Sequence, residues 1–282
     1  MGSVLTLRRS ADPSAASDRT FASRSAVVTG GASGIGLAIA RDLARGGAVV
    51  TLADVDVERA EVHARALREQ GAKAEAVEID VTDRGAVDDL LRRVADEHGR
   101  LDLMFNNAGV GGTLPFEEAT AQQWDRILAL NLRSVIDGTD AAYRLMRAQG
   151  GGHIVNTASI AGLVPVPMQT LYNTTKFGVV GLSTTLRPEA AAHGVRVSVV
   201  CPGQVATAIW GTPILGERDL SAPAPPQAVS AERAAAAVLR GVRRNQAVIT
   251  FPTPARRLAL AYRYAPWAMS RWLGAEHARR AG

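Results

Sequence analysis

The stretch TGGASGIG at residues 29–36 decides the fold of this chain. It follows the short apolar run AVVT at 26–29 and opens a segment, 35–45, with the apolar spacing of a helix. Glycines between a strand and a helix allow a tight turn and let the backbone approach a pyrophosphate, whose charge is then stabilised by the amides of the helix N-terminus. The spacing G-x-x-x-G-x-G in this position predicts a dinucleotide-binding turn.

The same alternation of apolar runs and helical segments continues along the chain. We expect strands at 26–29, 48–52, 74–79, 101–105, 153–157, 195–200 and 247–251. We expect helices at 35–45, 57–70, 83–98, 122–148 and 170–187, with Pro188 ending or kinking the last one. Repeated strand–helix order implies right-handed crossovers, so the pattern predicts an α/β fold with a doubly wound parallel sheet of the Rossmann type.

Length and composition exclude several classes of protein. The chain has 282 residues, enough to bury a large core, and its single Cys and scattered His predict neither an intramolecular disulfide nor a metal site. Basic residues gather at the ends, since residues 232–282 hold ten Arg against two Glu. With 5% aromatic residues, no nucleic-acid partner is expected. The absence of disulfides and of a long apolar run predicts a cytoplasmic protein.

Composition divides the chain into three parts. We expect a flexible leader over residues 1–24, one Rossmann-type α/β domain over 25–252 and a basic amphipathic tail over 253–282. Within the domain, the Pro- and Gly-rich segment 204–230 is expected to be a substrate loop, the alternative being an insertion without a role. The tail combines Arg with Trp and Tyr, which fits a lid over the substrate, an arm across a neighbouring subunit or a peripheral membrane contact, the alternative being a tail without a role.

An acidic residue at the end of the second expected strand indicates which dinucleotide is bound. Asp54 lies about twenty residues past the glycines, where a carboxylate accepts the adenosine ribose hydroxyls and repels a 2′-phosphate. Its neighbours Ser33 and Val55 are not basic, which favours NAD over NADP. The alternative is that Asp54 caps the next helix. Asp80 and Val81, after the third strand, are expected at the adenine edge.

The spacing of Tyr172 and Lys176 indicates acid–base chemistry. Residues at i and i+4 share one face of a helix, and a neighbouring ammonium favours the ionised form of a phenol. Ser159 follows the fifth expected strand, thirteen residues before the tyrosine. Only two of the thirty-two basic residues are lysines, Lys73 and Lys176, which mildly supports a specific need for lysine at position 176.

These motifs together resemble the short-chain dehydrogenase/reductase family in its single-domain form. The resemblance covers residues 24–210 and rests on motifs that occur in the family's order. Besides the glycine motif and Tyr172-x-x-x-Lys176, they are Asp80, Asn106-Asn107-Ala108-Gly109, Asn131, Ser159 and Pro202-Gly203.

The resemblance implies a role for each site residue. Tyr172 would be the general acid/base, Lys176 would lower its pKa and bind the nicotinamide ribose, and Ser159 would stabilise charge on the substrate oxygen. Asn131 would hold a water that relays protons. The resemblance also implies a homotetramer or dimer. The cofactor-binding residues it implies, together with those above, are Gly30, Ser33, Gly34, Ile35, Gly36, Asp54, Val55, Asp80, Val81, Asn107, Ala108, Gly109, Tyr172, Lys176, Pro202, Gly203, Val205 and Thr207.

The expected substrate side is mostly apolar. It comprises Val110 to Phe116, Leu163 to Met168 and the 204–230 loop, which predicts a lipophilic secondary alcohol or ketone, such as a steroid, a terpenoid or a polyketide-like compound. One alternative is a ketoreductase for 3-oxoacyl groups. Another is a dinucleotide-binding scaffold without turnover that its tail recruits to membranes, although the Ser–Tyr–Lys set is complete.

Overall fold

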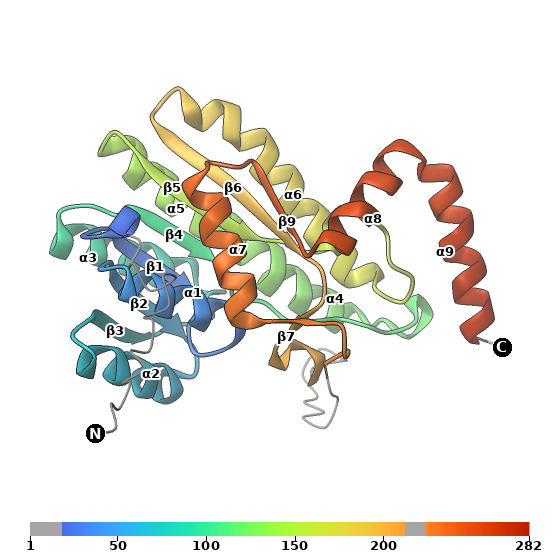
Figure 1. The fold of residues 1–282 in the computed structure, drawn as a ribbon, viewed down its shortest axis with the longest axis horizontal. Helices are drawn as coiled ribbons and strands as arrows, with labels where there is room; N and C mark the ends of the chain where they lie inside the picture. Colours follow the sequence, from blue (N-terminus) through green and yellow to red (C-terminus); the bar gives the residue numbers. More distant parts are fainter. Residues whose placement is uncertain (1–18, 212–223, 282) are drawn as a thin grey trace, which may run out of the picture.

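One parallel sheet of seven strands organises the computed structural model, which describes residues 19–211 and 224–281 (Figure 1). The strand order is β3-β2-β1-β4-β5-β6-β9. The chain therefore reverses direction across the sheet between β1 and β4, the place where such folds bind nucleotides. The predicted doubly wound sheet is confirmed. Its strands are β1 (Ser25–Thr29), β2 (Val49–Asp54), β3 (Lys73–Glu78), β4 (Leu103–Asn106), β5 (Gly152–Thr157), β6 (Val195–Pro202) and β9 (Val248–Phe251).

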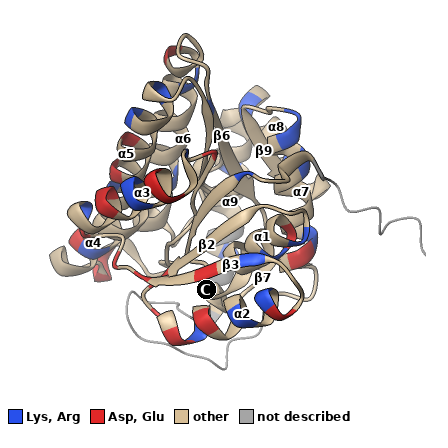
Figure 2. Ribbon diagram, turned by 90° about the vertical axis from the view of Figure 1, so that its left-hand side faces the viewer, with Lys and Arg blue, Asp and Glu red and all other residues tan. Residues whose placement is uncertain are grey.

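Helices cover both faces of the sheet because the central strands are apolar on both sides. Successive side chains of a strand point to opposite faces, so Val28 packs in one core and Val27 in the other. The first core is closed by α1 (Gly34–Arg45), α2 (Val57–Glu69) and α7 (Ala231–Arg243). The second is closed by α3 (Arg84–His98), α5 (Ser134–Ala148) and α6 (Thr170–Ala191), as the turned view in Figure 2 shows.

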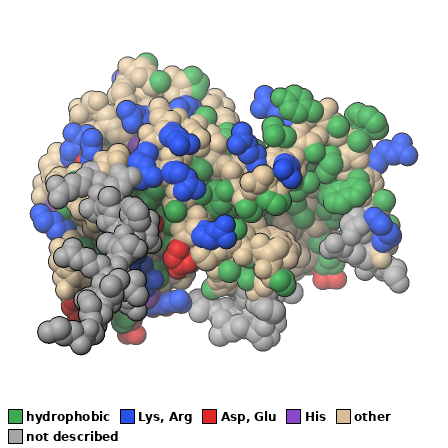
Figure 3. Space-filling model, viewed as in Figure 1, with side chains coloured by type: hydrophobic (Ala, Val, Ile, Leu, Met, Phe, Trp, Pro, Cys, Tyr) green, Lys and Arg blue, Asp and Glu red, His purple; other side chains and the backbone are tan. Residues whose placement is uncertain are grey.

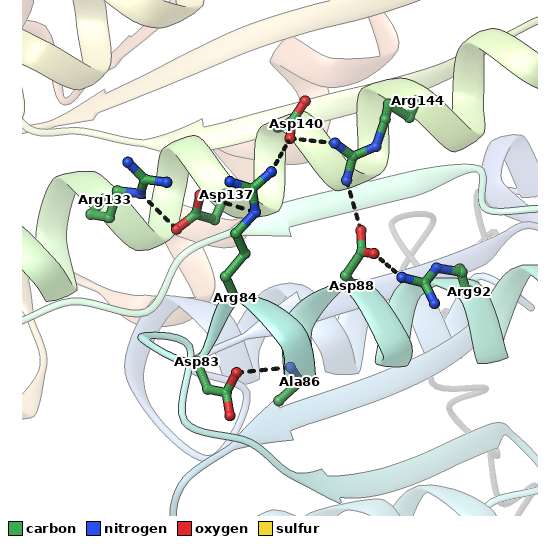
Figure 4. Close-up of polar contacts among 9 residues, drawn as sticks. All are labelled: Asp83, Arg84, Ala86, Asp88, Arg92, Arg133, Asp137, Asp140 and Arg144. Carbon is green, nitrogen blue, oxygen red and sulfur yellow. Dashed lines mark hydrogen bonds and ion pairs between the residues drawn. The ribbon is translucent and has the colours of Figure 1, made fainter.

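Charged residues lie on the helices and on the edge strand β3 (Figure 2). On β3, charges discourage pairing with the strand of another molecule. Between α3 and α5, ion pairs fasten the two helices together (Figure 4). Arg84 Nη2 lies 3.1 Å from Asp140 Oδ2, and Arg144 Nη2 lies 2.8 Å from Asp88 Oδ1.

The expected helix 122–148 is divided in three. It consists of α4 (Ala121–Leu128), a π-helical turn η4 (Ala129–Arg133) and α5. A π-turn inserts one residue into the helical ladder and often occurs at functional sites. Its effect here is to place Asn131, which is completely buried, on the side facing the ends of the strands. Helical spacing continues through the turn, so the pattern of apolar residues does not reveal it.

We expected Pro188 to end or kink the preceding helix. The helix does not end there. α6 continues through Pro188 to Ala191. Proline removes one backbone donor, which here is the one that would bond the carbonyl of Thr184, and only the last turn of the helix follows it. The glycine at 178 has a packing reason, because an added Cβ would lie 2.9 Å from Leu132 Cδ1. Gly178 is therefore explained by packing inside the chain and does not by itself indicate a neighbouring subunit.

The segment 204–230 has some regular structure. β7 (Val205–Ala206) pairs with β8 (Val229–Ser230), and η6 (Ala208–Gly211) lies between them in sequence. The middle of this expected substrate loop, 212–223, lies outside the described residues, as does the part of the expected leader at 1–18.

Two helices follow the last strand. α8 (Thr253–Tyr264) starts directly after β9, and α9 (Pro266–Ala281) packs on α8 and extends beside the domain (Figure 1). Pro266 is the first residue of α9, a position where its missing N–H costs no helical hydrogen bond. None of the helices in the described ranges is long and apolar enough to cross a membrane.

Candidate active site

The glycine turn between β1 and α1 is held against the end of β4 by Thr29. Its hydroxyl accepts hydrogen bonds from the backbone N–H groups of Asn107 (2.9 Å) and Ala108 (3.1 Å) and donates one to the carbonyl of Phe105 (3.2 Å). Gly30 has φ +66°, and an added Cβ would lie 3.0 Å from Ala108 Cα. Only glycine permits this close approach. The structure thus brings together the predicted residues at the ends of two neighbouring strands.

The N-terminus of α1 is suited to an anion. Ser33 precedes the helix without a side-chain capping bond, and the first turn contains no acidic residue. The positive end of the helix dipole and its free amides are therefore not neutralised by the chain itself, which fits the pyrophosphate of a dinucleotide. The predicted cofactor residues in this turn are Ser33, Gly34, Ile35 and Gly36.

Asp54 lies beside the glycine turn and does not cap α2. Its Oδ2 accepts a hydrogen bond from the backbone N–H of Ala32 (2.9 Å). The cap of α2 is Asp56, whose Oδ1 accepts from the N–H of Arg59 (3.1 Å). The alternative explanation of Asp54 as a helix cap is therefore wrong. Val55, the next residue, is exposed.

Asp80 and Val81 lie between the end of β3 and the start of α3. Asp80 Oδ1 accepts hydrogen bonds from the backbone N–H and the hydroxyl of Thr82, at 2.9 and 2.7 Å. Val81 is buried and shares a small cavity with Thr29 and Ala108. Val81 therefore packs directly beside the turns that follow β1 and β4.

Ser159, Tyr172 and Lys176 converge where β5 ends. Ser159 caps the short turn η5 (Ile160–Gly162), with its Oγ accepting from the N–H of Ala161 at 3.1 Å. Lys176 Nζ lies 5.4 Å from the ring centre of Tyr172 and donates a hydrogen bond to the carbonyl of Thr157 at 3.1 Å. The last residue of β5 thus positions the ammonium group. Sequence reasoning did not identify Thr157, because a backbone acceptor leaves no signal in residue type.

Asn131 is fixed by two hydrogen bonds to Val110. Its Oδ1 accepts from the Val110 N–H (2.9 Å), and its Nδ2 donates to the Val110 carbonyl (2.8 Å). Gly109 lies between this side chain and the lysine and leaves room for both. An added Cβ there would lie 2.9 Å from Asn131 Oδ1 and 3.6 Å from Lys176 Nζ. The predicted residues Gly109, Asn131 and Lys176 therefore meet at one point.

Burial dominates the electrostatics of this group. It raises the pKa of Tyr172 from its ordinary value of 10.0 to about 12, and a hydrogen bond from Ser159 acts in the opposite direction. Burial also lowers the pKa of Lys176 from 10.5 to about 8. The thiol of Cys201, at the end of β6, lies in the same apolar surroundings, and burial raises its pKa to about 12. That Lys176 lowers the Tyr172 pKa stays a prediction.

The residues predicted beside the nicotinamide follow β6. The Gly203 N–H donates to the carbonyl of Phe251 (2.7 Å), and an added Cβ on Gly203 would lie 2.8 Å from Ala255 Cβ in α8. Thr207 faces the glycine turn, with its Cγ2 3.2 Å from the position of an added Cβ on Gly34. Two further predicted residues, Pro202 and Val205, are buried.

The loops beside Tyr172 enclose a small apolar cluster. Leu114, Ile127 and Leu171 are buried, and Trp124 packs partly buried against them. The N–H of Leu114 donates to the carbonyl of Met168 (2.9 Å), which joins the two loops predicted to line the substrate side. Trp124 was missed by sequence reasoning, because its helix lies between the motifs and carries no signature of its own.

Fold and site together define an oxidoreductase of the dinucleotide-binding class. A family model described as short chain dehydrogenase matches residues 24–214. Levodione reductase from Leifsonia aquatica is 38% identical over 198 residues, which are 69% of this chain and 72% of that protein. 3beta-Hydroxysteroid dehydrogenase 2 from Eggerthella lenta is 37% identical over 191 residues, covering 67% and 74%. The chain belongs to the short-chain dehydrogenase family.

Solved structures agree in fold and include both nicotinamide cofactors. A short-chain dehydrogenase/reductase from Burkholderia phymatum in complex with NAD is 28% identical, with a TM-score of 0.79 over 86% of this chain and 94% of that one. A short-chain dehydrogenase from Sphingobium yanoikuyae in complex with NADPH is 29% identical, with a TM-score of 0.73 over 92% and 94%.

Proposed function

We propose that this oxidoreductase transfers a hydride between NAD(H) and a lipophilic secondary alcohol or ketone. The observation that carries the proposal is the convergence of Ser159, Tyr172 and Lys176 at the end of β5, with the lysine ammonium held by the Thr157 carbonyl. An acid–base group, a charged group and a hydroxyl that converge at one point are what the interconversion of an alcohol and a ketone requires.

Each residue has a defined task in this chemistry. Bound NAD or NADH accepts or supplies the hydride. Tyr172 takes the hydroxyl proton during oxidation and returns a proton to the carbonyl oxygen during reduction. Ser159 donates a hydrogen bond to the same substrate oxygen. Lys176 stabilises the ionised phenol and binds the nicotinamide ribose hydroxyls, while Asn131 and the backbone at Val110 organise the route by which protons reach solvent.

The preference for NAD rests on Asp54. Its carboxylate accepts a hydrogen bond from Ala32 within the glycine turn, so its charge is held where an adenosine ribose would lie. A 2′-phosphate at that position would be repelled. The remaining predicted contacts, which include Asp80 and Val81 at the adenine and Thr207 at the nicotinamide, belong to the same proposal.

The lipophilic substrate class is supported by the apolar loops. Leu114, Trp124 and Met168 come from the elements that flank Tyr172, and Leu114 and Trp124 belong to one apolar cluster with it. A steroid, named for the relative from Eggerthella lenta, belongs to this class. The 3-oxoacyl alternative would in addition require a cationic entrance for a carrier.

A panel of hydrophobic secondary alcohols and ketones, each offered with NAD(H) and NADP(H), tests the proposal. Reduced nicotinamide is followed by absorbance. We expect turnover with NAD(H) on lipophilic compounds, and a loss of at least about a hundredfold in kcat for Tyr172→Phe with NADH binding retained. Full activity in that variant would remove Tyr172 from the mechanism, and a preference for sugars or acids would overturn the substrate class.

We further propose a homotetramer or dimer formed through α6. The exposed side chain of Phe177 on this helix supports it, because a large apolar group on an exposed helix face is suited to a subunit contact. Sedimentation equilibrium of the full chain and of Phe177→Glu tests it. A wild-type monomer would contradict the proposal.

A further inference from the structure

Helices α8 and α9 carry a concentration of exposed apolar side chains. Ten large apolar side chains are exposed in the described ranges, and four of them lie in these two helices. They are Leu260 (44% exposed), Tyr264 (79%), Trp267 (71%) and Trp272 (51%). Figure 3 shows hydrophobic side chains gathered over α8 and α9, with Lys or Arg beside them. We call these four residues, with the arginines named below, the α8–α9 surface. Gathered exposed aromatic residues indicate a contact surface.

The packing of α8 explains why this face is left uncovered. Ala255 is buried, and Leu258, Ala259 and Tyr262 are half-buried, at the spacing of one helix face. This face therefore packs on β9 and α9. Leu260 and Tyr264 lie on the other face of α8 and have no part in the hydrophobic cores of the described chain.

Arginines share the exposed face with these apolar residues. Arg256, Leu260 and Tyr264 follow one another at intervals of four residues, and Arg271 follows Trp267 at the same interval. Arg257 and Arg263 are also exposed on α8. Residues 253–282 contain six Arg and a single Glu. The surface is therefore both aromatic and strongly cationic.

These arginines differ from those that join α3 to α5. On α3 and α5, Arg84 and Arg144 are paired with aspartates (Figure 4). By contrast, Arg256, Arg257, Arg263 and Arg271 have no described carboxylate within ion-pair distance. Their charge is not neutralised by the described part of the chain, so it is available to an anionic partner.

We propose that the α8–α9 surface binds to a membrane surface that contains anionic lipids. Trp and Tyr are favoured at the level of the lipid headgroups, and each Arg near an anionic surface gains electrostatic energy. A helix with apolar and cationic residues together lies in the interface and does not span the bilayer. Two copies of this surface would bring unpaired arginines face to face, which argues against its use in a symmetric dimer.

Co-sedimentation of the full chain with lipid vesicles tests this proposal. Vesicles of equal parts phosphatidylcholine and phosphatidylglycerol are compared with vesicles of phosphatidylcholine alone. We expect binding to the anionic vesicles only, weakening as salt is raised. Arg256→Gln with Arg257→Gln should lower the partition coefficient about fivefold for each Arg removed. Trp267→Ser with Trp272→Ser should lower it at least about tenfold, because both indoles leave the interface.

Matched controls separate the surface from general charge and hydrophobicity. Arg45→Gln with Arg65→Gln removes the same charge from exposed positions on α1 and α2, and Val62→Ser removes an exposed apolar side chain from α2. Both should bind vesicles as the wild type does. Thermal unfolding followed by circular dichroism checks that each variant is folded, and the two variant pairs test the surface independently.

Three results would overturn the proposal. The first is equal binding, or no binding, to the anionic and the neutral vesicles. The second is unchanged binding by both the arginine and the tryptophan variants. The third is a wild type that ignores vesicles while Trp267→Ser with Trp272→Ser lowers the mass of the assembly in sedimentation velocity, which would assign the surface to a neighbouring copy of this chain.

Discussion

Asn131 and Val110 are joined by a reciprocal pair of hydrogen bonds: the side-chain oxygen accepts from the Val110 N–H at 2.9 Å, and the side-chain nitrogen donates to the Val110 carbonyl at 2.8 Å. Both backbone groups of Val110 are therefore satisfied by one buried side chain. This pair ties the π-helical turn after α4 to the loop after β4, which carries Gly109 to within reach of Lys176.

Asn131→Ala should destabilise the protein and lower activity together. Each of the two backbone groups of Val110 that is left without a partner costs about 1 to 3 kcal/mol, so we expect a loss of about 2 to 6 kcal/mol in the free energy of unfolding. Urea denaturation measures this loss, and kcat with NADH measures the displacement of the loop. Gln246→Ala, at an exposed position after α7, is the control. Unchanged stability would mean that the pair contributes little.

Lys176 should make stability depend on pH in a defined window. Burial lowers its pKa from 10.5 to about 8, so between these values the unfolded chain binds more protons than the folded one. The free energy of unfolding then rises with pH by up to about 1.4 kcal/mol per unit. The ordinary values of Cys201 and Tyr172 are 9.0 and 10.0, and their raised pKa values oppose this trend above those points.

The effect is therefore clearest between pH 8 and 9, the interval between the lowered pKa of Lys176 and the ordinary value for Cys201. Lys176→Met should abolish the rise there, as measured by urea denaturation at closely spaced pH values. Lys73 is the only other lysine of the chain and is exposed on β3. The Lys73→Met variant should therefore retain the rise in stability with pH. A rise that persists in Lys176→Met belongs to another group.

Asp54→Asn should change the choice of cofactor. The amide keeps an oxygen for the Ala32 N–H but removes the charge, so a 2′-phosphate is no longer repelled. We expect the ratio of kcat/KM for NAD to that for NADP to fall about tenfold, the equivalent of about 1.4 kcal/mol. Asp56→Asn is the control, because Asp56 caps α2 and should not alter this ratio. An unchanged ratio in Asp54→Asn would refute the specificity role.

Asp137→Asn should be more damaging than a comparable change on the surface. The Asp137 carboxylate is only 6% exposed and lies 2.9 Å from Arg133 Nε and 3.8 Å from Arg84 Nε (Figure 4). It joins the end of the π-helical turn to α3. We expect a loss of about 1 to 2 kcal/mol in the free energy of unfolding.

Asp89→Asn is the matched control, because that carboxylate is 76% exposed and paired with Arg92 on one helix. It should cost less than about 0.5 kcal/mol. Urea denaturation at neutral pH compares the two. Equal effects would show that the pairing of Asp137 across the helices adds nothing to its local contacts.

Local patterns of apolar residues and glycines predict the order of strands and helices along the chain and the positions of the main motifs. Apolar runs bounded by glycines predict buried parallel strands, and the carboxyl ends of such strands meet at one edge of the sheet. The positions of Asp54, Ser159 and Tyr172 at these ends could therefore be predicted from the residues, with family resemblance adding Asn131.

What the tertiary structure alone decided are the contacts between residues that are distant in the chain. The π-helical turn holds Asn131 against Val110, and helical spacing cannot encode that pairing. Asp56, and not Asp54, caps α2, while Asp54 accepts hydrogen bonds from the backbone N–H groups of Ala32 and Asp56. The face of α8 that is left uncovered depends on how β9 and α9 pack against it. In each case one polar or apolar group has several possible partners along the sequence. Which of them it contacts depends on the distances between residues in the folded chain, and local sequence patterns do not contain these distances.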